Sequence, residues 1–458
     1  MKNTIILLFV KMFEKGIMFL FFMLLAQTFG KEVFGEFSYY FTIATLLFVL
    51  FDLGGEFYQI REFSKAERLK NFNTIFLIKS AIFLIIFATT FIITNNIYLL
   101  LLLGSYYLDS IISIFRSSLY KNGHYILESK FTIIEKSIFI AIVFANILSI
   151  QNILVMYFAF LLSKFIYLLI LSKKFYKFRY VLKTKKLFDL NFAKYYLTNA
   201  WSYVLHALLV VVFVQIDIIM LMQMNISFGD IGLYSAAVKI YMTVIIFADV
   251  LFKLYYPLVA KYLQNGEQET LKKLVLKIQD TNLFFSIYFA IITMLFAPEI
   301  ISLAFGEEFV ESSKMLILLS IIIIFRFSMY TYTAILSSSN LNHIKLYTSL
   351  ACVVTNIVLN YILIPIYGVY GAIIATVLTE ILLVFLYKIS SFKVIFTNIL
   401  TKQEIVIMLF GALMLFLFLD YQFSLLEKFI FLVVIALSLI FNLQNIKAKL
   451  NFQKAINE

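Results

Sequence analysis

Hydrophobic residues occur in long unbroken runs along this chain, and polar residues gather in short segments between the runs. A run of about 20 apolar residues has the length of a helix that crosses a bilayer. We therefore predict fourteen membrane-spanning helices. They are expected near residues 5–29, 36–56, 73–94, 97–116, 131–149, 153–171, 196–221, 232–259, 281–304, 314–335, 346–365, 368–387, 403–420 and 425–443.

The composition supports an all-α integral membrane protein. Of the 458 residues, 63% are hydrophobic and 14% are charged, and the mean hydropathy is +0.96. Polar groups in this proportion could not cover the surface of a soluble protein, whereas a bilayer removes the need for that cover. The apolar residues form runs instead of alternating, which excludes a closed barrel. The opening segment carries Lys11, Glu14 and Lys15 where a signal peptide needs an apolar stretch, so we expect a retained first helix. Cys352 lies in an apolar run and is expected to be a core residue.

The basic residues predict the orientation of the spans. Segments on one side of the predicted membrane hold 27 Lys or Arg residues, and segments on the other side hold only Lys31, Lys314 and Lys428. Because basic loops stay in the cytoplasm, both termini are predicted to be cytoplasmic. The stretch from Ser172 to Lys194 alone contains eight of these residues, mixed with Phe and Tyr, and is typical of an amphipathic segment on the anionic inner leaflet. The net charge of +12 is spread over every inner loop, so it does not indicate nucleic-acid binding.

A weak internal repeat divides the chain into two lobes. A shift of 197 residues aligns Gly35 with Gly232, and Asp52 with Asp249. We predict two six-helix lobes related by a pseudo-two-fold axis along the membrane normal. The expected organisation is an N-terminal lobe at 1–171, a cytoplasmic linker at 172–195, a C-terminal lobe at 196–390 and two extra helices with a tail at 391–458.

Cations within the predicted spans are the candidate substrate-binding residues. Charged groups in hydrocarbon are costly and should face a cavity or a partner. Lys15, Lys164, Lys239 and Arg326 lie nearest the middle of their spans, and we predict that they share a water-filled cavity between the lobes. Such a cavity would select anions, with Arg suited to phosphate. Further cations of this predicted site, nearer the inner face, are Lys11 and Lys253.

Acids within the spans are candidates for coupling transport to a proton or Na⁺. They are Asp52, Asp109, Asp217, Asp249 and Glu380. Several charges also have structural alternatives. Lys79 and Arg116 could extend to water at the inner interface, Asp249 could pair with Lys253 along one helix face, and Glu14 is better placed to pair with Lys11 than with Lys15.

Other chemistry finds no support in the sequence. The three histidines, at positions 124, 206 and 343, are far apart and form no metal-binding motif, so no metal site is expected. No Gly-rich phosphate-binding loop is present, which makes ATP hydrolysis improbable. We expect a protein that is not an enzyme and has no cofactor beyond a coupling ion, H⁺ or Na⁺.

Three segments resemble a known family. They are FGEFSYYFTIATLLFVLFDLGGEFYQIREFSK at 34–65, QIDIIMLMQMNISFGDIGLYSAAVKIY at 215–241 and LAFGEEFVESSKMLILLS at 303–320. The chain resembles bacterial polysaccharide-unit flippases, the O-antigen and capsule repeat-unit transporters of the multidrug and oligosaccharidyl-lipid exporter superfamily. Asp217 and the turn Gly232-Leu233-Tyr234 match the most recurrent pattern.

The resemblance implies a specific cargo and place of action. A twelve-helix core with two extra helices would carry an undecaprenyl-diphosphate-linked oligosaccharide across the bacterial cytoplasmic (inner) membrane by ion-coupled alternating access. The resemblance also implies contact with a polysaccharide polymerase and with glycosyltransferases. It does not assign the cavity cations, which rest on their depth in the spans alone.

Three alternatives remain open at this point. A multidrug exporter of the same superfamily would favour an acidic cavity. A membrane glycosyltransferase or repeat-unit polymerase would need a sizeable outer loop, and the sequence has none. A flippase for the cell-wall precursor lipid II falls within the favoured class.

Overall fold

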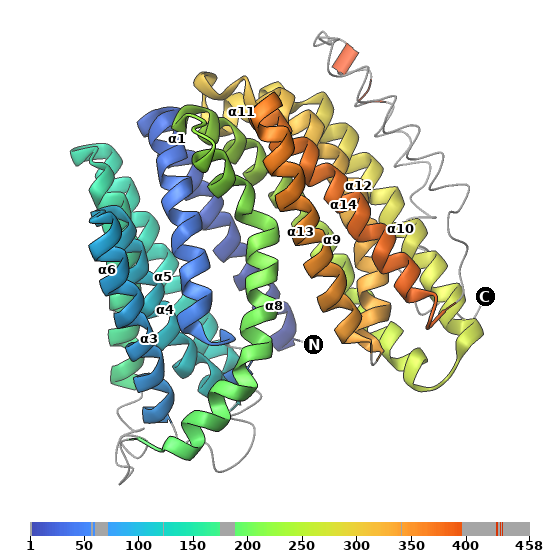
Figure 1. Ribbon diagram of the computed structural model, residues 1–458, viewed down its shortest axis with the longest axis horizontal. Helices are drawn as coiled ribbons and strands as arrows, with labels where there is room; N and C mark the ends of the chain where they lie inside the picture. The colour runs from blue at the N-terminus through green and yellow to red at the C-terminus, as the bar shows by residue number, and fades with distance from the viewer. Residues whose placement is uncertain are drawn as a thin grey trace. The chain divides into compact units, whose positions relative to one another are not determined.

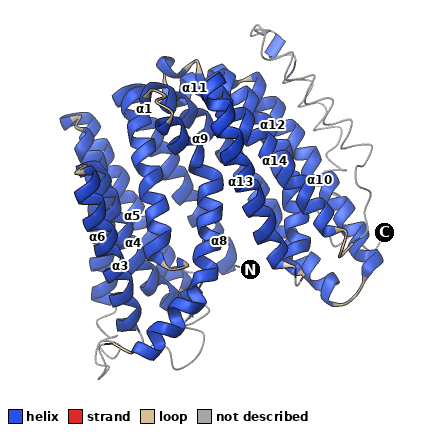
Figure 2. Cartoon of the chain, viewed as in Figure 1, coloured by secondary structure: helices blue, strands red, loops and turns tan. Residues whose placement is uncertain are grey.

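The computed structural model is helical throughout the part of the chain that it describes. The described residues are 2–55, 58–59, 72–121, 123–174, 188–339, 341–395, 427–428, 431 and 433. Within these ranges the structure contains helices and short connections and no strand (Figure 2). Ten of these helices are long and apolar enough to cross a membrane. The predicted all-α membrane class is therefore confirmed, while the spans predicted at 403–420 and 425–443 lie wholly or largely outside the described residues.

The helices form two compact units, Met1–Ile219 and Met220–Glu458 (Figure 1). The helices of the first unit are α1 (Lys2–Asp52), α3 (Phe72–Thr94), α4 (Ile97–Lys121), α5 (Tyr125–Ala145), which the π-helix η2 (Asn146–Ile150) continues, α6 (Ile153–Lys174) and α8 (Leu190–Gln223), whose last turn falls in the second unit. Those of the second are α9 (Phe228–Gln264), α10 (Gln268–Leu295), α11 (Ala297–Phe305), the 3₁₀ turn η4 (Glu307–Phe309), α12 (Ser312–Ser338), α13 (Asn342–Tyr367) and α14 (Val369–Ser391).

Helix α1 is broken once, at Gly30. This residue has φ 77° and ψ 178°, in a region that favours glycine. The break falls between the two spans predicted at 5–29 and 36–56, and it separates the 51 residues of α1 into two segments. The shift of 197 residues also aligns Phe37 with Tyr234 and Ser38 with Ser235, and all four residues are buried.

Aromatic packing holds the first unit together. Phe21 of α1 lies 5.4 Å from Phe37 and 5.0 Å from Phe160 of α6, measured between ring centroids. Such edge-to-face pairs add to the burial of large apolar surfaces. Helix α8, which the sequence analysis assigned to the second lobe, places Tyr196 and Ala200 in a core with Tyr58 of the first unit. The lobe boundaries at 171 and 196 stay a prediction.

In the second unit α12 is the central helix. Helices α9, α10 and α14 all pack against it, and most of its residues are buried. The span predicted at 281–304 has the wrong bounds, and the helix in this region is α10. It begins at Gln268, thirteen residues earlier, and ends at Leu295. Pro298 then lies in the first turn of the separate helix α11. Backbone N–H groups in a first turn have no acceptor within the helix, so the missing N–H of proline costs no hydrogen bond there. Cys352 is buried in α13, as predicted for a core residue.

Helices α13 and α14 meet closely at Gly371. A Cβ atom added there would lie 2.3 Å from the backbone oxygen of Leu363. Gly371→Ala must separate the two helices and is expected to reduce stability by about 1–3 kcal/mol, measured as a lower Tm in detergent. Gly16→Ala is the matched control, because no atom lies within 4 Å of its added Cβ. Equal melting of the two variants would contradict this account of the contact.

Candidate functional site

The first unit contains a buried cluster of charges between α4, α5 and α6. The Nζ of Lys164 lies 2.7 Å from Oδ1 of Asp109 and 3.6 Å from Oε1 of Glu135. The same Glu135 oxygen lies 3.2 Å from Nζ of Lys136. Two lysines and two carboxylates therefore share one group of contacts, which we call the α4–α6 cluster. Lys164, which was predicted to bind substrate, and Asp109, which was predicted to bind the coupling ion, are therefore in direct contact.

The cluster continues toward Arg116 at one end. Nε of Arg116 lies 3.0 Å from Oε1 of Glu128, which also accepts a hydrogen bond from Thr132 Oγ1 at 2.9 Å. The suggestion that Arg116 extends to water is therefore wrong, because burial between helices leaves its side chain 10% exposed beside a carboxylate.

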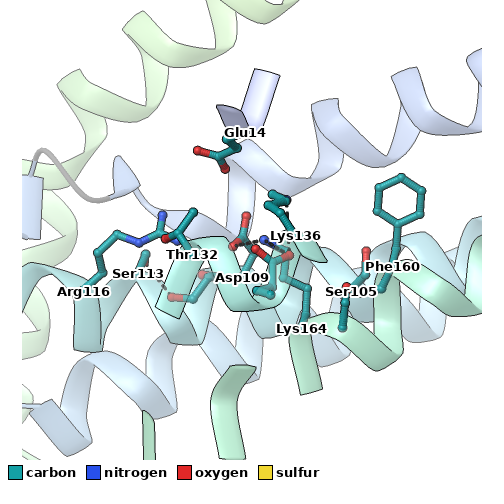
Figure 3. A network of polar contacts seen from close by, with 12 residues as sticks. Glu14, Ser105, Asp109, Ser113, Arg116, Thr132, Lys136, Phe160 and Lys164 are labelled. Atoms are coloured by element: carbon teal, nitrogen blue, oxygen red, sulfur yellow. Dashed lines mark hydrogen bonds and ion pairs between the residues drawn. The ribbon is translucent and has the colours of Figure 1, made fainter. Parts of the chain in front are cut away.

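Helix α1 supplies the exposed side of the cluster. Lys11 donates a hydrogen bond of 3.1 Å to Glu14, as predicted from their spacing. Glu14 interacts electrostatically with Lys136 and Lys164 as well, and Figure 3 shows Glu14 on a different helix from these lysines, above Asp109. The side chains of Asp109 and Glu14 are 29% and 24% exposed, whereas that of Glu135 is 1% exposed. Solvent therefore reaches the cluster at Asp109 and Glu14 but not at Glu135. Lys15 is exposed on α1.

A second buried pair joins α1, α3 and α4. Lys79 is fully buried and its Nζ lies 2.7 Å from Oδ1 of Asp52. Ser110 and Ser113 surround the same ammonium group, at 3.0 and 3.3 Å from their hydroxyl oxygens. The alternative that Lys79 extends to water is wrong, because Asp52 and these serines replace its hydration. Asp52, a predicted coupling acid, is held in this pair.

The second unit contains its own buried pair. Arg326 of α12 donates a hydrogen bond to Glu380 of α14, and both side chains are largely buried. Oε2 of Glu380 is buried and has no hydrogen-bond partner among the described residues. Arg326, which was predicted to bind substrate, and Glu380, which was predicted to bind the coupling ion, therefore contact one another. Asp249 of α9 accepts a hydrogen bond of 2.6 Å from the hydroxyl group of Tyr330.

The remaining predicted site residues lie on α8 and α9. Asp217 is buried in α8. Lys239 is half-buried in α9, and Lys253 is exposed on the same helix. The cavity predicted to collect Lys15, Lys164, Lys239 and Arg326 draws on both units, and it stays a prediction.

A cavity of about 760 Å³ lies within the second unit, between the start of α9 and the start of α14. Its charged lining residues are Asp230, Glu311, Lys314 and Lys428, and Lys428 is also paired with Glu299. None of the residues predicted to bind substrate or ion lines it.

The structural class is now defined: a multi-pass α-helical membrane protein with buried ion pairs inside its apolar helices. Residues 1–263 match the model of the family described as polysaccharide biosynthesis protein. Because this match covers more than half of the chain, the protein belongs to that family.

Solved structures with the same fold are transporters. The lipid II flippase MurJ, in an inward closed conformation, matches with a TM-score of 0.70 and 18% identity over 96% of this chain and 100% of that chain. An inward-facing multidrug resistance MATE family transporter of the MOP superfamily matches with a TM-score of 0.62 and 13% identity over 88% of this chain and 95% of that one. A MOP superfamily transporter from Pyrococcus furiosus matches with a TM-score of 0.55 and 14% identity over 92% and 97%. No curated protein matches the chain.

These findings confirm the resemblance drawn from the sequence at the level of family and fold. The family is that of polysaccharide biosynthesis proteins, the fold is the one found in the MurJ flippase and in MATE transporters, and the protein is a multi-pass membrane protein. At these identities the structural matches establish the fold alone.

Proposed function

We propose that this protein is a flippase for an undecaprenyl-diphosphate-linked oligosaccharide, an O-antigen or capsule repeat unit. It would act in the bacterial cytoplasmic membrane with both termini in the cytoplasm. Family membership supports a role in polysaccharide biosynthesis. The observation that carries the proposal is the α4–α6 cluster, since Lys136 and Lys164 place two ammonium groups beside the buried Glu135, and Lys164 also contacts the partly exposed Asp109. Charges at such positions are costly and are typical of transport pathways.

The proposed mechanism is alternating access without a covalent step. The diphosphate of the lipid carrier would contact cations of the protein, the sugars would occupy water, and the polyprenyl chain would remain in lipid. Lys164 and Arg326 are each paired with a carboxylate. The phosphates would therefore have to displace the Asp109 and Glu380 carboxylates from these two cations. Exchange at these pairs would couple the substrate to an ion, H⁺ or Na⁺. Glycosyltransferases would supply the substrate on the cytoplasmic side and a polymerase would receive it outside.

Reconstituted protein provides the test. Proteoliposomes would receive a fluorescent undecaprenyl-diphosphate oligosaccharide, and the fraction accessible to a membrane-impermeant quencher would be followed over time. Protein-dependent movement between leaflets is the expected result. No movement of this lipid, together with transport of an organic cation, would favour the multidrug exporter instead. Preferential movement of lipid II would favour the cell-wall precursor.

A further inference from the structure

Glu135 is the buried carboxylate of the α4–α6 cluster that no sequence argument singled out. Its side chain is 1% exposed, and its Oε1 atom contacts the ammonium groups of both Lys136 and Lys164. Its other oxygen, Oε2, is buried and has no hydrogen-bond partner among the described residues. A buried carboxylate oxygen without a partner is a costly arrangement, so it calls for an explanation.

The charges around Glu135 are balanced in the absence of substrate. They come from every helix that packs against α5 as well as from α5 itself. The groups are Lys11 and Glu14 on α1, Asp109 and Arg116 on α4, Lys164 on α6, and Glu128 and Lys136 on α5. With Glu135 included, four cations face four carboxylates. A diphosphate that enters this cluster adds at least two negative charges, and these are not compensated, because the four carboxylates already balance the four cations.

We propose that Glu135 takes up a proton when a lipid diphosphate binds to Lys136 and Lys164. This inference rests on the proposed function and identifies the acid that responds to the substrate. The phosphate oxygens replace Glu135 Oε1 at the two ammonium groups, and a proton supplied by the buffered solvent neutralises the displaced carboxylate. Asp109 is the less suitable acceptor because its partly exposed side chain can remain hydrated after Lys164 is withdrawn. By linkage, proton uptake on binding means that affinity for the diphosphate falls as pH rises.

Calorimetry on the intact protein in detergent tests this proposal, with geranylgeranyl diphosphate as the probe. Titrations in buffers of different ionisation enthalpy give the number of protons taken up. The wild type is expected to take up about one proton more than Glu135→Gln, because glutamine cannot bind it. At pH 8 the variant is expected to bind the probe about tenfold more tightly, since no carboxylate competes for the lysines. The difference is expected to shrink as pH falls. Glu32→Gln, the same change at an exposed position of α1, is the control that should match the wild type.

The possible results distinguish this inference from the proposed function. Weaker binding by Glu135→Gln with unchanged proton uptake would make Glu135 a structural residue and overturn the proposal. If the wild type fails to bind the probe, the proposed function fails and the inference fails with it. Infrared difference spectra of wild-type protein labelled with ¹³C-glutamate provide a second measurement that needs no variant. Binding is expected to produce the shifted carbonyl band of a protonated glutamate, and the absence of that band would overturn the proposal.

Discussion

Replacing Lys79 by methionine is expected to lower the free energy of unfolding by about 3–5 kcal/mol. The ammonium group of Lys79 lies within 3.3 Å of four oxygens, from Asp52, Ser110 and Ser113. Methionine fills a similar volume but leaves the Asp52 carboxylate buried without its cation. The contact joins α1, α3 and α4, so its loss weakens the packing of three helices. Thermal unfolding in detergent, followed by circular dichroism, measures the effect.

A double variant separates the effect of the unpaired Asp52 charge on stability from the effect of the lost Lys79 packing. Asp52→Asn together with Lys79→Met removes the unpaired charge, and this double variant is expected to recover most of the lost stability. Lys130→Met is the control, because Lys130 is exposed on α5 and its loss should change stability by no more than about 0.5 kcal/mol. A double variant as unstable as Lys79→Met alone would show that Lys79 acts through its serine contacts and not through Asp52.

Apolar run length was sufficient to predict most of the helices. The spans expected at 73–94, 97–116 and 153–171 coincide closely with α3, α4 and α6. The error at α10 has a physical cause, since its first half is polar on average. Leu271, Leu274 and Ile278 nonetheless recur at helical spacing and are all buried. An averaged hydropathy window does not detect an amphipathic segment of this kind, whereas its periodicity does.

The charged sites were harder to predict, because the depth of a residue in its span does not show which residue it pairs with. Depth in the predicted spans singled out both Lys164 and Asp109, but their contact depends on how α4 and α6 pack. Glu128 was missed because the predicted span began at 131, although α5 begins at Tyr125. One signal in the sequence could have found the site, since Glu128 and Glu135 are seven residues apart and share a helix face.

Neutralising both members of the Arg326–Glu380 pair is expected to reduce lipid flipping about tenfold or more, equivalent to about 1.4 kcal/mol in the barrier. Arg326→Gln alone would leave Glu380 buried and unpaired, so the loss of transport could follow from unfolding. The double variant Arg326→Gln with Glu380→Gln removes both charges and retains side chains that can hydrogen-bond to each other. It should therefore melt near the wild-type Tm while lacking a cation for phosphate and an acid for the ion. The rate of flipping in proteoliposomes and the Tm in detergent are measured on the same preparation.

The second unit provides a matched control for this experiment. Lys428 and Glu299 form another ion pair, and Glu299 belongs to the short helix α11. Lys428→Gln with Glu299→Gln makes the same chemical change at a pair that does not include Arg326 or Glu380, and flipping is expected to stay at the wild-type rate. If the Arg326 and Glu380 double variant also flips lipid normally, the pair serves the packing of α12 against α14. In that case the phosphate contact must be sought at Lys136 and Lys164, which are the cations of the α4–α6 cluster in the first unit.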